Sequence, residues 1–72
     1  MDLEKLIVVT PGIRSGKPCI VGTRITVYDI LDYLASGMTE DEILRDYPHL
    51  ESADFPAVYA YASQAPRKRT LN

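Results

Sequence analysis

The sequence predicts an α+β domain that is mostly α, in which short N-terminal strands and a β-hairpin precede a three-helix helix-turn-helix unit. An apolar run at residues 6–9 lacks helical period and indicates a strand. Two β-type runs flank Gly22-Thr23 and indicate a hairpin. From Val27 onward, apolar residues recur at helical spacing. We therefore expect one domain over residues 1–72, with a β region at 1–26, three helices at 27–64 and a basic tail at 65–72.

The β region is expected to start with a strand at Leu6–Val9. Thr10-Pro11-Gly12 ends this continuous apolar run, so the strand should be buried on both faces. In the hairpin that follows, residues 19–21 and 24–26 form the two arms. Gly22 takes the first central position of a two-residue turn, where a glycine suits type II′.

The first helix is expected to carry its apolar residues on one face and to end at a glycine. Gly37 follows the last apolar position, where a C′ residue with positive φ closes many helices. The apolar face comprises Val27, Ile30, Leu31, Leu34 and Ala35.

The second helix begins at a capping box. The Thr39 hydroxyl can accept the amide of Glu42, and the Glu42 carboxylate can accept the amide of Thr39. The helix stops before Pro48, because the residue before a proline disfavours the α conformation. A tight turn then leads to a third helix, which Ser52 caps and which has Pro56 in its first turn. Its buried face is expected to comprise Phe55, Val58, Tyr59 and Ala62.

Several sequence blocks resemble one known family when they are taken in order. They read G-K-P-C-I-V-G-T-R-I-T-V, then G-M-T-E-D-E-I-L, then Y-P-H-L, then Y-A-Y-A. This order resembles the bacterial domain-of-unknown-function family 433, which is often grouped with VapB-type antitoxins. The resemblance implies an antitoxin that neutralises a PIN-like nuclease toxin and binds its own operator DNA as a helix-turn-helix dimer.

Chain length and cysteine content favour a homodimer. A chain of 72 residues buries a limited fraction of its surface, and a single cysteine forms no internal disulfide. No apolar run approaches the ~18 residues that a membrane span needs, so we expect a cytoplasmic protein. The expected dimer interface comprises Leu6, Ile7, Val8, Val9, Ile20, Val21 and Ile25.

The charge distribution weakens the DNA-binding interpretation of the third helix. The chain has net charge −2, and residues 37–54 contain six carboxylates and one basic residue. The expected outward positions Asp54, Ala57, Ala60, Tyr61 and Gln64 include no Arg or Lys, which most often contact phosphate and guanine. Phosphate contacts should then come from the β end and the tail. The expected DNA-binding residues are Lys17, Arg24, Ser52, Tyr61, Gln64, Arg67, Lys68 and Arg69.

The rival hypothesis is a protein-interaction module or adaptor that does not bind DNA. Tyr28 and Tyr33 lie off the apolar stripes and are expected to bind a partner protein, because tyrosine offers a large contact area. Tyr47 and Tyr59 lie on the stripes and should be in or near the core. For the off-stripe tyrosines, simple solvation remains the alternative. For the tail, the alternative is a solubilising terminus.

The sequence predicts no enzyme. The segment at residues 12–18 superficially suggests a phosphate-binding loop, but three residues instead of four separate its glycines, and Pro18 follows the lysine. Cys19 and His49 are expected to be a small buried hydrophobe and a helix-end cap, not a catalytic pair. We therefore expect no cofactor, metal or small-molecule substrate.

Overall fold

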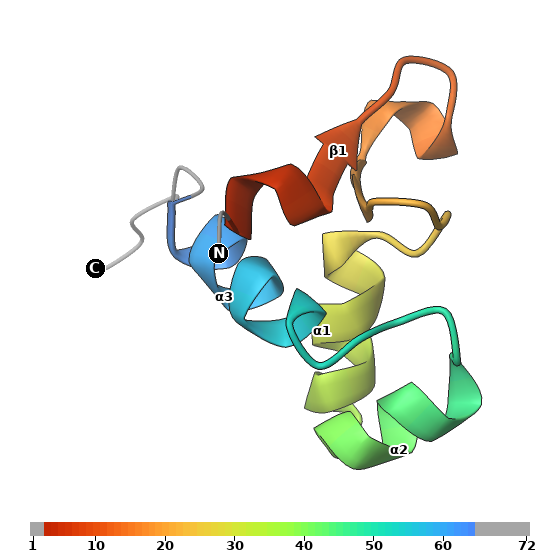
Figure 1. The fold of residues 1–72 in the computed structure, drawn as a ribbon, viewed down its shortest axis with the longest axis vertical. Coiled ribbons are helices and arrows are strands. Elements are labelled where there is room, and N and C mark those ends of the chain that lie inside the picture. Colours follow the sequence, from red (N-terminus) through yellow and green to blue (C-terminus); the bar gives the residue numbers. More distant parts are fainter. Residues whose placement is uncertain (1–2, 65–72) are drawn as a thin grey trace.

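The computed structural model of this chain describes residues 3–64 and has two short strands followed by three α-helices (Figure 1). The α+β fold class predicted from the sequence is confirmed. The elements are η1 (Leu3–Leu6), β1 (Ile7–Val9), η2 (Arg14–Gly16), β2 (Pro18–Ile20), α1 (Val27–Ala35), α2 (Glu40–Asp46) and α3 (Asp54–Gln64), where η denotes a 3-10 helix.

The sheet is built differently from the predicted hairpin. β1 and β2 pair antiparallel, with Ile7 opposite Ile20, Val8 opposite Cys19 and Val9 opposite Pro18. The segment after β2 contributes only an isolated bridge between Cys19 and Thr26. The predicted second arm is present only as this bridge, together with a hydrogen bond of 2.8 Å from the Ile20 amide to the Ile25 carbonyl. The bridge has the predicted register, but the arm does not form a strand, and β2 pairs along its length with β1 instead.

The turn after β2, however, is one residue out of its predicted register. The Thr23 amide donates a hydrogen bond of 3.0 Å to the Ile20 carbonyl, so Val21 and Gly22 are the two central residues. Gly22 has φ +78° and occupies the second central position, as a type II turn requires, and the type II′ prediction is wrong. The Thr23 hydroxyl fixes this register, because it donates to the Ile20 carbonyl at 2.9 Å and accepts the Ile25 amide at 3.0 Å.

β1 is not buried on both faces. Ile7 packs against the core, whereas Val8 is 38% exposed and Val9 is 56% exposed. In this single chain the helices cover one side of the two-stranded sheet. The continuous apolar run therefore predicted the strand correctly, but the predicted burial on both faces is wrong.

The ends of α1 show two helix-capping arrangements. At its start, Thr26 and Asp29 form a capping box with both hydrogen bonds at 2.9 Å. At its end, the Gly37 amide donates to the Leu34 carbonyl and the Met38 amide donates to the Tyr33 carbonyl, both at 3.1 Å. This is a Schellman motif with Gly37 at φ +105°, as the sequence predicted for the C′ position.

The predicted capping box of α2 is confirmed, but the predicted tight turn after α2 is wrong. The Thr39 hydroxyl accepts the Glu42 amide at 3.1 Å, and the Glu42 carboxylate accepts the Thr39 amide at 2.8 Å. α2 ends at Asp46 and α3 begins at Asp54, so seven residues separate the helices. Helix-turn-helix motifs usually have three or four. The longer connection carries Leu50, which is buried in the core.

The start of α3 depends on Asp54 and not on a Ser52 side-chain cap. The Asp54 carboxylate accepts the Glu51 amide at 2.8 Å, while Ser52 contributes only its backbone carbonyl, to the Phe55 amide at 3.3 Å. Asp54 is therefore buried at 5% exposure and does not face outward.

The buried face of α3 is rotated from the predicted one. Phe55 and Val58 are fully buried as predicted, but Tyr59 is 43% exposed and Ala57 is buried. Tyr59 was predicted to face inward because Val58 and Tyr59 lie three and four residues after Phe55, which is the spacing of one helix face. The structure instead turns Ala57 and Asp54 toward the protein interior.

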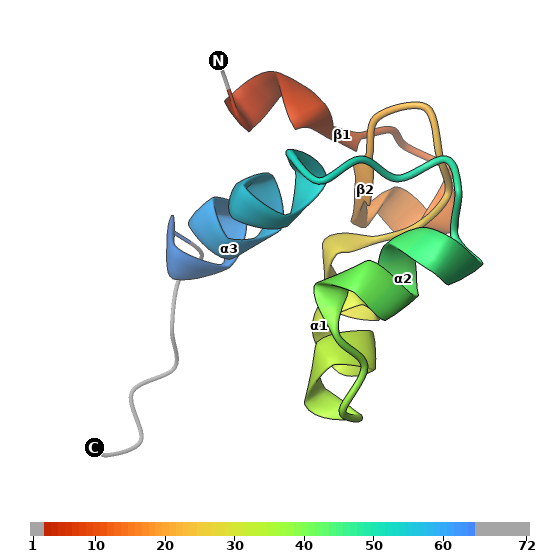
Figure 2. The ribbon, with the colours of Figure 1, turned by 60° about the horizontal axis from the view of Figure 1, so that its bottom comes forward.

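All three helices and β2 contribute to one core. α2 lies beside α1, α3 packs on α1 and against η1, and the strands lie at the N-terminal end of α1 (Figures 1 and 2). No helix among residues 3–64 has the length and apolar content to cross a membrane. The core comprises Ile20, Val27, Ile30, Ile43, Leu50, Phe55 and Val58.

Candidate interaction surfaces

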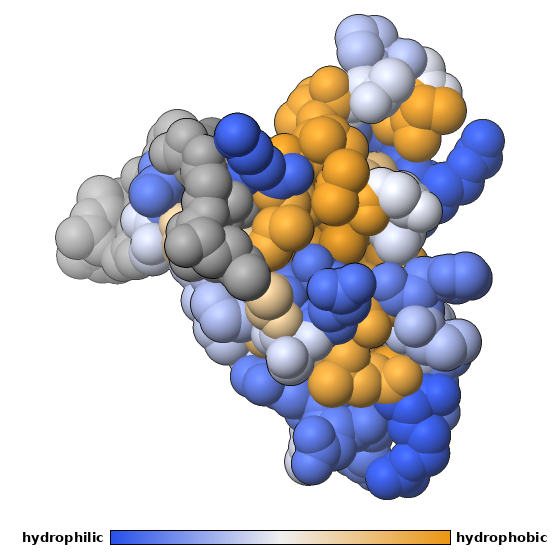
Figure 3. Space-filling model, in the orientation of Figure 1, coloured by the Kyte–Doolittle hydropathy of each residue, from blue (hydrophilic) through white to orange (hydrophobic). Residues whose placement is uncertain are grey.

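Three exposed valines lie on β1 and in the turn after β2, and we call Val8, Val9 and Val21 the valine surface. Their exposed fractions are 38%, 56% and 46%. Val8 and Val9 are successive residues of β1 and point to opposite faces of the sheet. Hydrophobic side chains gather over β1 in the space-filling view (Figure 3). An exposed apolar cluster of this kind commonly marks a protein contact.

One edge of β1 is unpaired within the described residues. The Val21 amide donates to the Leu6 carbonyl at 2.8 Å, which makes Leu6 and Val21 a hydrogen-bonded pair. In an antiparallel ladder, hydrogen-bonded and non-hydrogen-bonded pairs alternate. The backbone amides and carbonyls of Ile7 and Val9 therefore point away from β2, toward the unpaired edge.

The structure divides the seven predicted interface residues into three groups. Ile20 is wrong as an interface residue, because it is 1% exposed and belongs to the core. Leu6, Ile7 and Ile25 are half-buried, and the two isoleucines pack against the core. The valine surface contains the remaining three residues.

The outward face of α3 has no basic residue. Pro56, Tyr59, Ser63 and Gln64 are exposed there, whereas Tyr61 packs against the core. The predicted outward position of Tyr61 is therefore wrong, because the helix is rotated from the expected face.

A carboxylate of α2 lies directly against this α3 face. The Tyr59 hydroxyl donates a hydrogen bond of 2.6 Å to Glu40 Oε2. This hydrogen bond, with burial, raises the pKa of Tyr59 above its ordinary value. Negative charge therefore lies beside the helix that would enter a DNA groove.

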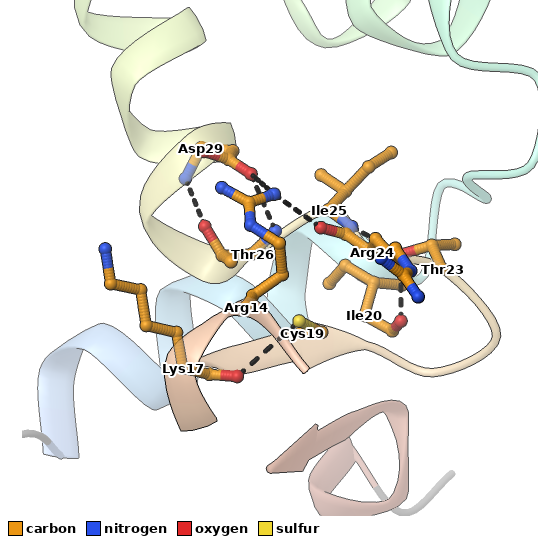
Figure 4. A network of polar contacts seen from close by, with 9 residues as sticks. All are labelled: Arg14, Lys17, Cys19, Ile20, Thr23, Arg24, Ile25, Thr26 and Asp29. Atoms are coloured by element: carbon orange, nitrogen blue, oxygen red, sulfur yellow. Dashed lines mark hydrogen bonds and ion pairs between the residues drawn. The ribbon is translucent and has the colours of Figure 1, made fainter. Parts of the chain in front are cut away.

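A basic loop lies between β1 and β2, and we define it as residues 13–17 together with Arg24, which follows β2. Arg14 and Ser15 adopt left-handed backbone conformations, with φ +49° and +58°. Non-glycine residues rarely take this conformation, which costs roughly 1–2 kcal/mol per residue. One Arg14 side-chain nitrogen, Nη1, donates to the Arg24 carbonyl at 2.7 Å and to the Asp29 carboxylate at 3.1 Å (Figure 4).

Asp29 joins this loop to the start of α1. Its Oδ2 accepts both the Thr26 amide and the Arg14 guanidinium. Burial acts to raise the pKa of Asp29, but the hydrogen bonds from Thr26 and the charge of Arg14 outweigh it, so the pKa is lowered. The carboxylate therefore stays ionised and holds Arg14 over the loop.

The other predicted DNA-binding residues are scattered. Lys17, Arg24 and Gln64 are exposed, and Ser52 is exposed in the connection before α3. The structure brings Lys17 and Arg24 into the basic loop but keeps Ser52 and Gln64 on other elements. Arg67, Lys68 and Arg69 lie outside the described residues.

The two tyrosines predicted to bind a partner have different environments. Tyr28 is 47% exposed on α1. Tyr33 stacks on Tyr47, with ring centroids 5.0 Å apart and planes 7° apart. Interaction with the Tyr47 hydroxyl, burial and the charge of Asp29 raise the pKa of Tyr33 to about 12. Tyr33 thus joins α1 to α2, and Tyr28 remains the more accessible of the two.

Cys19 and His49 have unrelated surroundings. Cys19 is 3% exposed in β2, with its Sγ 3.5 Å from the Lys17 carbonyl, which confirms a small buried residue. His49 is exposed after α2, and among the side chains of residues 5–64 it makes no hydrogen bond, so the predicted helix-end cap is not formed. The described residues contain no group of three or more His, Cys, Asp or Glu arranged to hold a metal ion.

Sequence reasoning missed the central role of Arg14, Asp29 and the Tyr59–Glu40 pair. The T-x-x-D spacing of Thr26 and Asp29 is a recognisable capping signal and could have identified Asp29. No local pattern indicates the left-handed conformation of Arg14 or its contact ten residues away. The Tyr59–Glu40 contact depends on how α2 and α3 pack.

Comparisons with known proteins identify the family. Residues 7–62 match the family described as "Protein of unknown function (DUF433)". The "Uncharacterized protein y4eO" of Sinorhizobium fredii is 29% identical over 63 residues, which are 88% of this chain and 28% of that protein. The crystal structure of a DUF433 member from Anabaena variabilis has a TM-score of 0.81 and 35% identity, covering 86% of this chain and 61% of that one. This chain therefore spans part of the length of both relatives, and it belongs to the DUF433 family.

Proposed function

We propose that this protein is the antitoxin of a toxin–antitoxin pair and acts mainly by binding proteins. The proposal is supported by an unpaired strand edge with exposed valines, which suits a dimer, and by the exposed Tyr28, which suits a toxin contact. The family resemblance suggests the partner, a PIN-like nuclease toxin. An exposed apolar surface and an acidic α2 suit protein contacts better than contacts with a nucleic acid.

In this proposal the unpaired edge of β1 joins two copies. Ile7 and Val9 direct their backbone groups outward, so a second β1 running antiparallel can place Ile7 opposite its Val9 and Val8 opposite its Val8. The pairing is symmetric, as a two-fold dimer requires. It would extend the sheet to four strands and place the two Val8 side chains opposite each other.

The toxin would then bind away from this edge. Tyr28 is the exposed tyrosine of α1, and tyrosine is enriched among residues that dominate binding energy at protein interfaces. It is therefore our first choice for a toxin contact. Tyr33 is less suited, because its ring already stacks on Tyr47.

Operator binding is the second candidate function, supported by the exposed cations of the basic loop. A helix-turn-helix mode through α3 is poorly supported. Seven residues separate α2 from α3, and Glu40 lies 2.6 Å from the Tyr59 hydroxyl on the outward face of α3. Any DNA contact should therefore rely on residues outside this face.

Co-expression with the product of the adjacent reading frame tests the antitoxin proposal. We expect that product to be a small nuclease with an acidic active site. It should co-elute with this protein in size-exclusion chromatography, and its RNA cleavage should be suppressed in the complex. A neighbouring nuclease that neither co-elutes nor loses activity would contradict the proposal. The variant Tyr28→Asp should weaken the complex while leaving the dimer intact.

A further inference from the structure

We propose that the basic loop, residues 13–17 with Arg24, is a contact surface for the phosphate backbone of double-stranded DNA. This inference rests on the operator-binding part of the proposed function and assigns it to a surface other than α3. It requires no recognition of base sequence by the loop itself.

The loop is held in shape before any ligand binds. Arg14 Nη1 is 2.7 Å from the Arg24 carbonyl, so one side chain connects the two ends of the basic loop (Figure 4). The Lys17 amide donates to the Arg14 carbonyl at 3.1 Å, which places Lys17 beside the same turn. A preorganised surface loses less conformational entropy when it binds.

The loop concentrates positive charge in an acidic protein. Arg14, Lys17 and Arg24 are exposed, and Asp29 is the carboxylate that pairs with one of them. The Arg14–Asp29 pair is the one salt bridge among the side chains of residues 5–64, so Lys17 and Arg24 are available to outside anions. The remaining described cations, Lys5 and Arg45, lie on η1 and α2, away from this turn.

The chemistry of the loop fits phosphate oxygens. The Lys17 ammonium precedes β2 and the Arg24 guanidinium follows it, so the two cations can contact separate phosphates of one backbone. Such contacts position a protein on DNA without reading sequence. The valine surface provides the apolar contact area expected of a protein interface, whereas the cations of the loop lie outside it. We therefore infer that the valine surface binds proteins and that the basic loop binds a polyanion.

The test compares two double variants of the full chain that each remove two positive charges. Lys17→Gln with Arg24→Gln alters the loop, and Lys5→Gln with Arg45→Gln is the matched control on exposed residues elsewhere. Binding is measured by fluorescence anisotropy at about 50 and about 200 mM salt, where counterion release separates phosphate contacts from other effects. The two probes are the upstream DNA of the gene and a random duplex of equal length.

We expect the loop variant to bind both duplexes more weakly and with a smaller salt dependence. The slope of log affinity against log salt should fall by about 0.9 for each phosphate that the variant no longer neutralises, so the affinity ratio between the two salt concentrations should shrink about threefold per phosphate. The control should keep the wild-type slope. Circular dichroism should show both variants folded, because the substituted side chains are exposed.

The remaining outcomes separate this inference from operator binding. A loop variant with the slope and affinity of the control would overturn the loop assignment and leave operator binding to another surface. Loop-dependent binding that is equal on both duplexes would support the loop and contradict operator recognition. If the wild-type protein binds neither duplex, both fail. If the loop variant loses the toxin complex but keeps its DNA affinity, the loop is a protein contact and the inference is wrong.

Discussion

Tyr59 on α3 and Glu40 on α2 are joined by a hydrogen bond of 2.6 Å from the tyrosine hydroxyl to Oε2. The two residues are 19 positions apart in the sequence. Glu40 opens α2, whose Ile43 is buried in the core, and Tyr59 is exposed on the outward side of α3. This contact therefore connects the two helices at the protein surface, where a helix-turn-helix would face DNA.

Removal of this contact should cost little stability but should change the titration of Tyr59. In a double-mutant cycle of Tyr59→Phe and Glu40→Gln, we expect a coupling of about 0.5–1 kcal/mol, because the 43% exposed tyrosine keeps much of its hydration. The raised pKa of Tyr59 means that the coupling is fully present below about pH 10 and is lost as pH rises through the raised pKa. Ultraviolet titration should show a lower tyrosine pKa in Glu40→Gln.

Asp29 should make the stability of the protein depend on acid pH. Its pKa is lowered in the folded state, so its contribution is present above its ordinary value near 3.8 and is lost as pH falls through the folded pKa. Asp29→Asn should lose about 1 kcal/mol near pH 7, through weaker capping and loss of the Arg14 pair. Urea unfolding near pH 3 should show a smaller difference from wild type. The control Asp32→Asn, at an exposed position of the same helix, should show little loss at either pH.

Gly37 should be sensitive to substitution for a backbone reason alone. A Cβ at this position would meet no atom within 4 Å, but φ is +105°. Gly37→Ala should therefore destabilise the protein by about 1 kcal/mol in urea unfolding. Gly37→Asn should recover part of this loss, because asparagine tolerates left-handed conformations better than alanine. Equal losses in both variants would show that backbone conformation is not the cause.

Val8 should separate dimerisation from folding. Because Val8 is already 38% exposed in the single chain, Val8→Asp should keep the helical circular dichroism spectrum. It should shift the sedimentation mass from about twice 8.1 kDa to the monomer value, since the charge would be buried between two copies. Ile7→Asp should instead disrupt both folding and assembly, because Ile7 packs against the core. A wild-type protein that sediments as a monomer at micromolar concentration would contradict the dimer.

Local sequence signals predicted the helices better than the sheet and the surfaces. The capping box of Thr39 and the C′ role of Gly37 depend on residues within one turn, and both predictions are confirmed. The pairing of β1 with β2 connects distant residues, and several registers satisfy the same apolar pattern. The sequence alone did not show that β2 pairs along its length with β1.

The candidate surfaces were predicted in part. Lys17 and Arg24 were expected at the β end and lie in the basic loop, but Arg14, which shapes that loop, was not identified. Tyr59 was expected near the core and is exposed, whereas Tyr61 was expected outside and packs against the core. A tyrosine is stable in either place, because its ring is apolar and its hydroxyl is polar. Helical spacing alone could not decide between them.

Because Cys19 is buried in the sheet, the chemical reactivity of this single thiol can report local opening of the sheet. The side chain is 3% exposed at the centre of the β2 pairing, between Val8 on one strand and Thr26 on the other side. An alkylating reagent can reach it only when the structure around β2 opens. The rate of thiol modification therefore measures how often the sheet opens, without any added label. Comparing that rate at low and high protein concentration would show whether assembly closes the sheet.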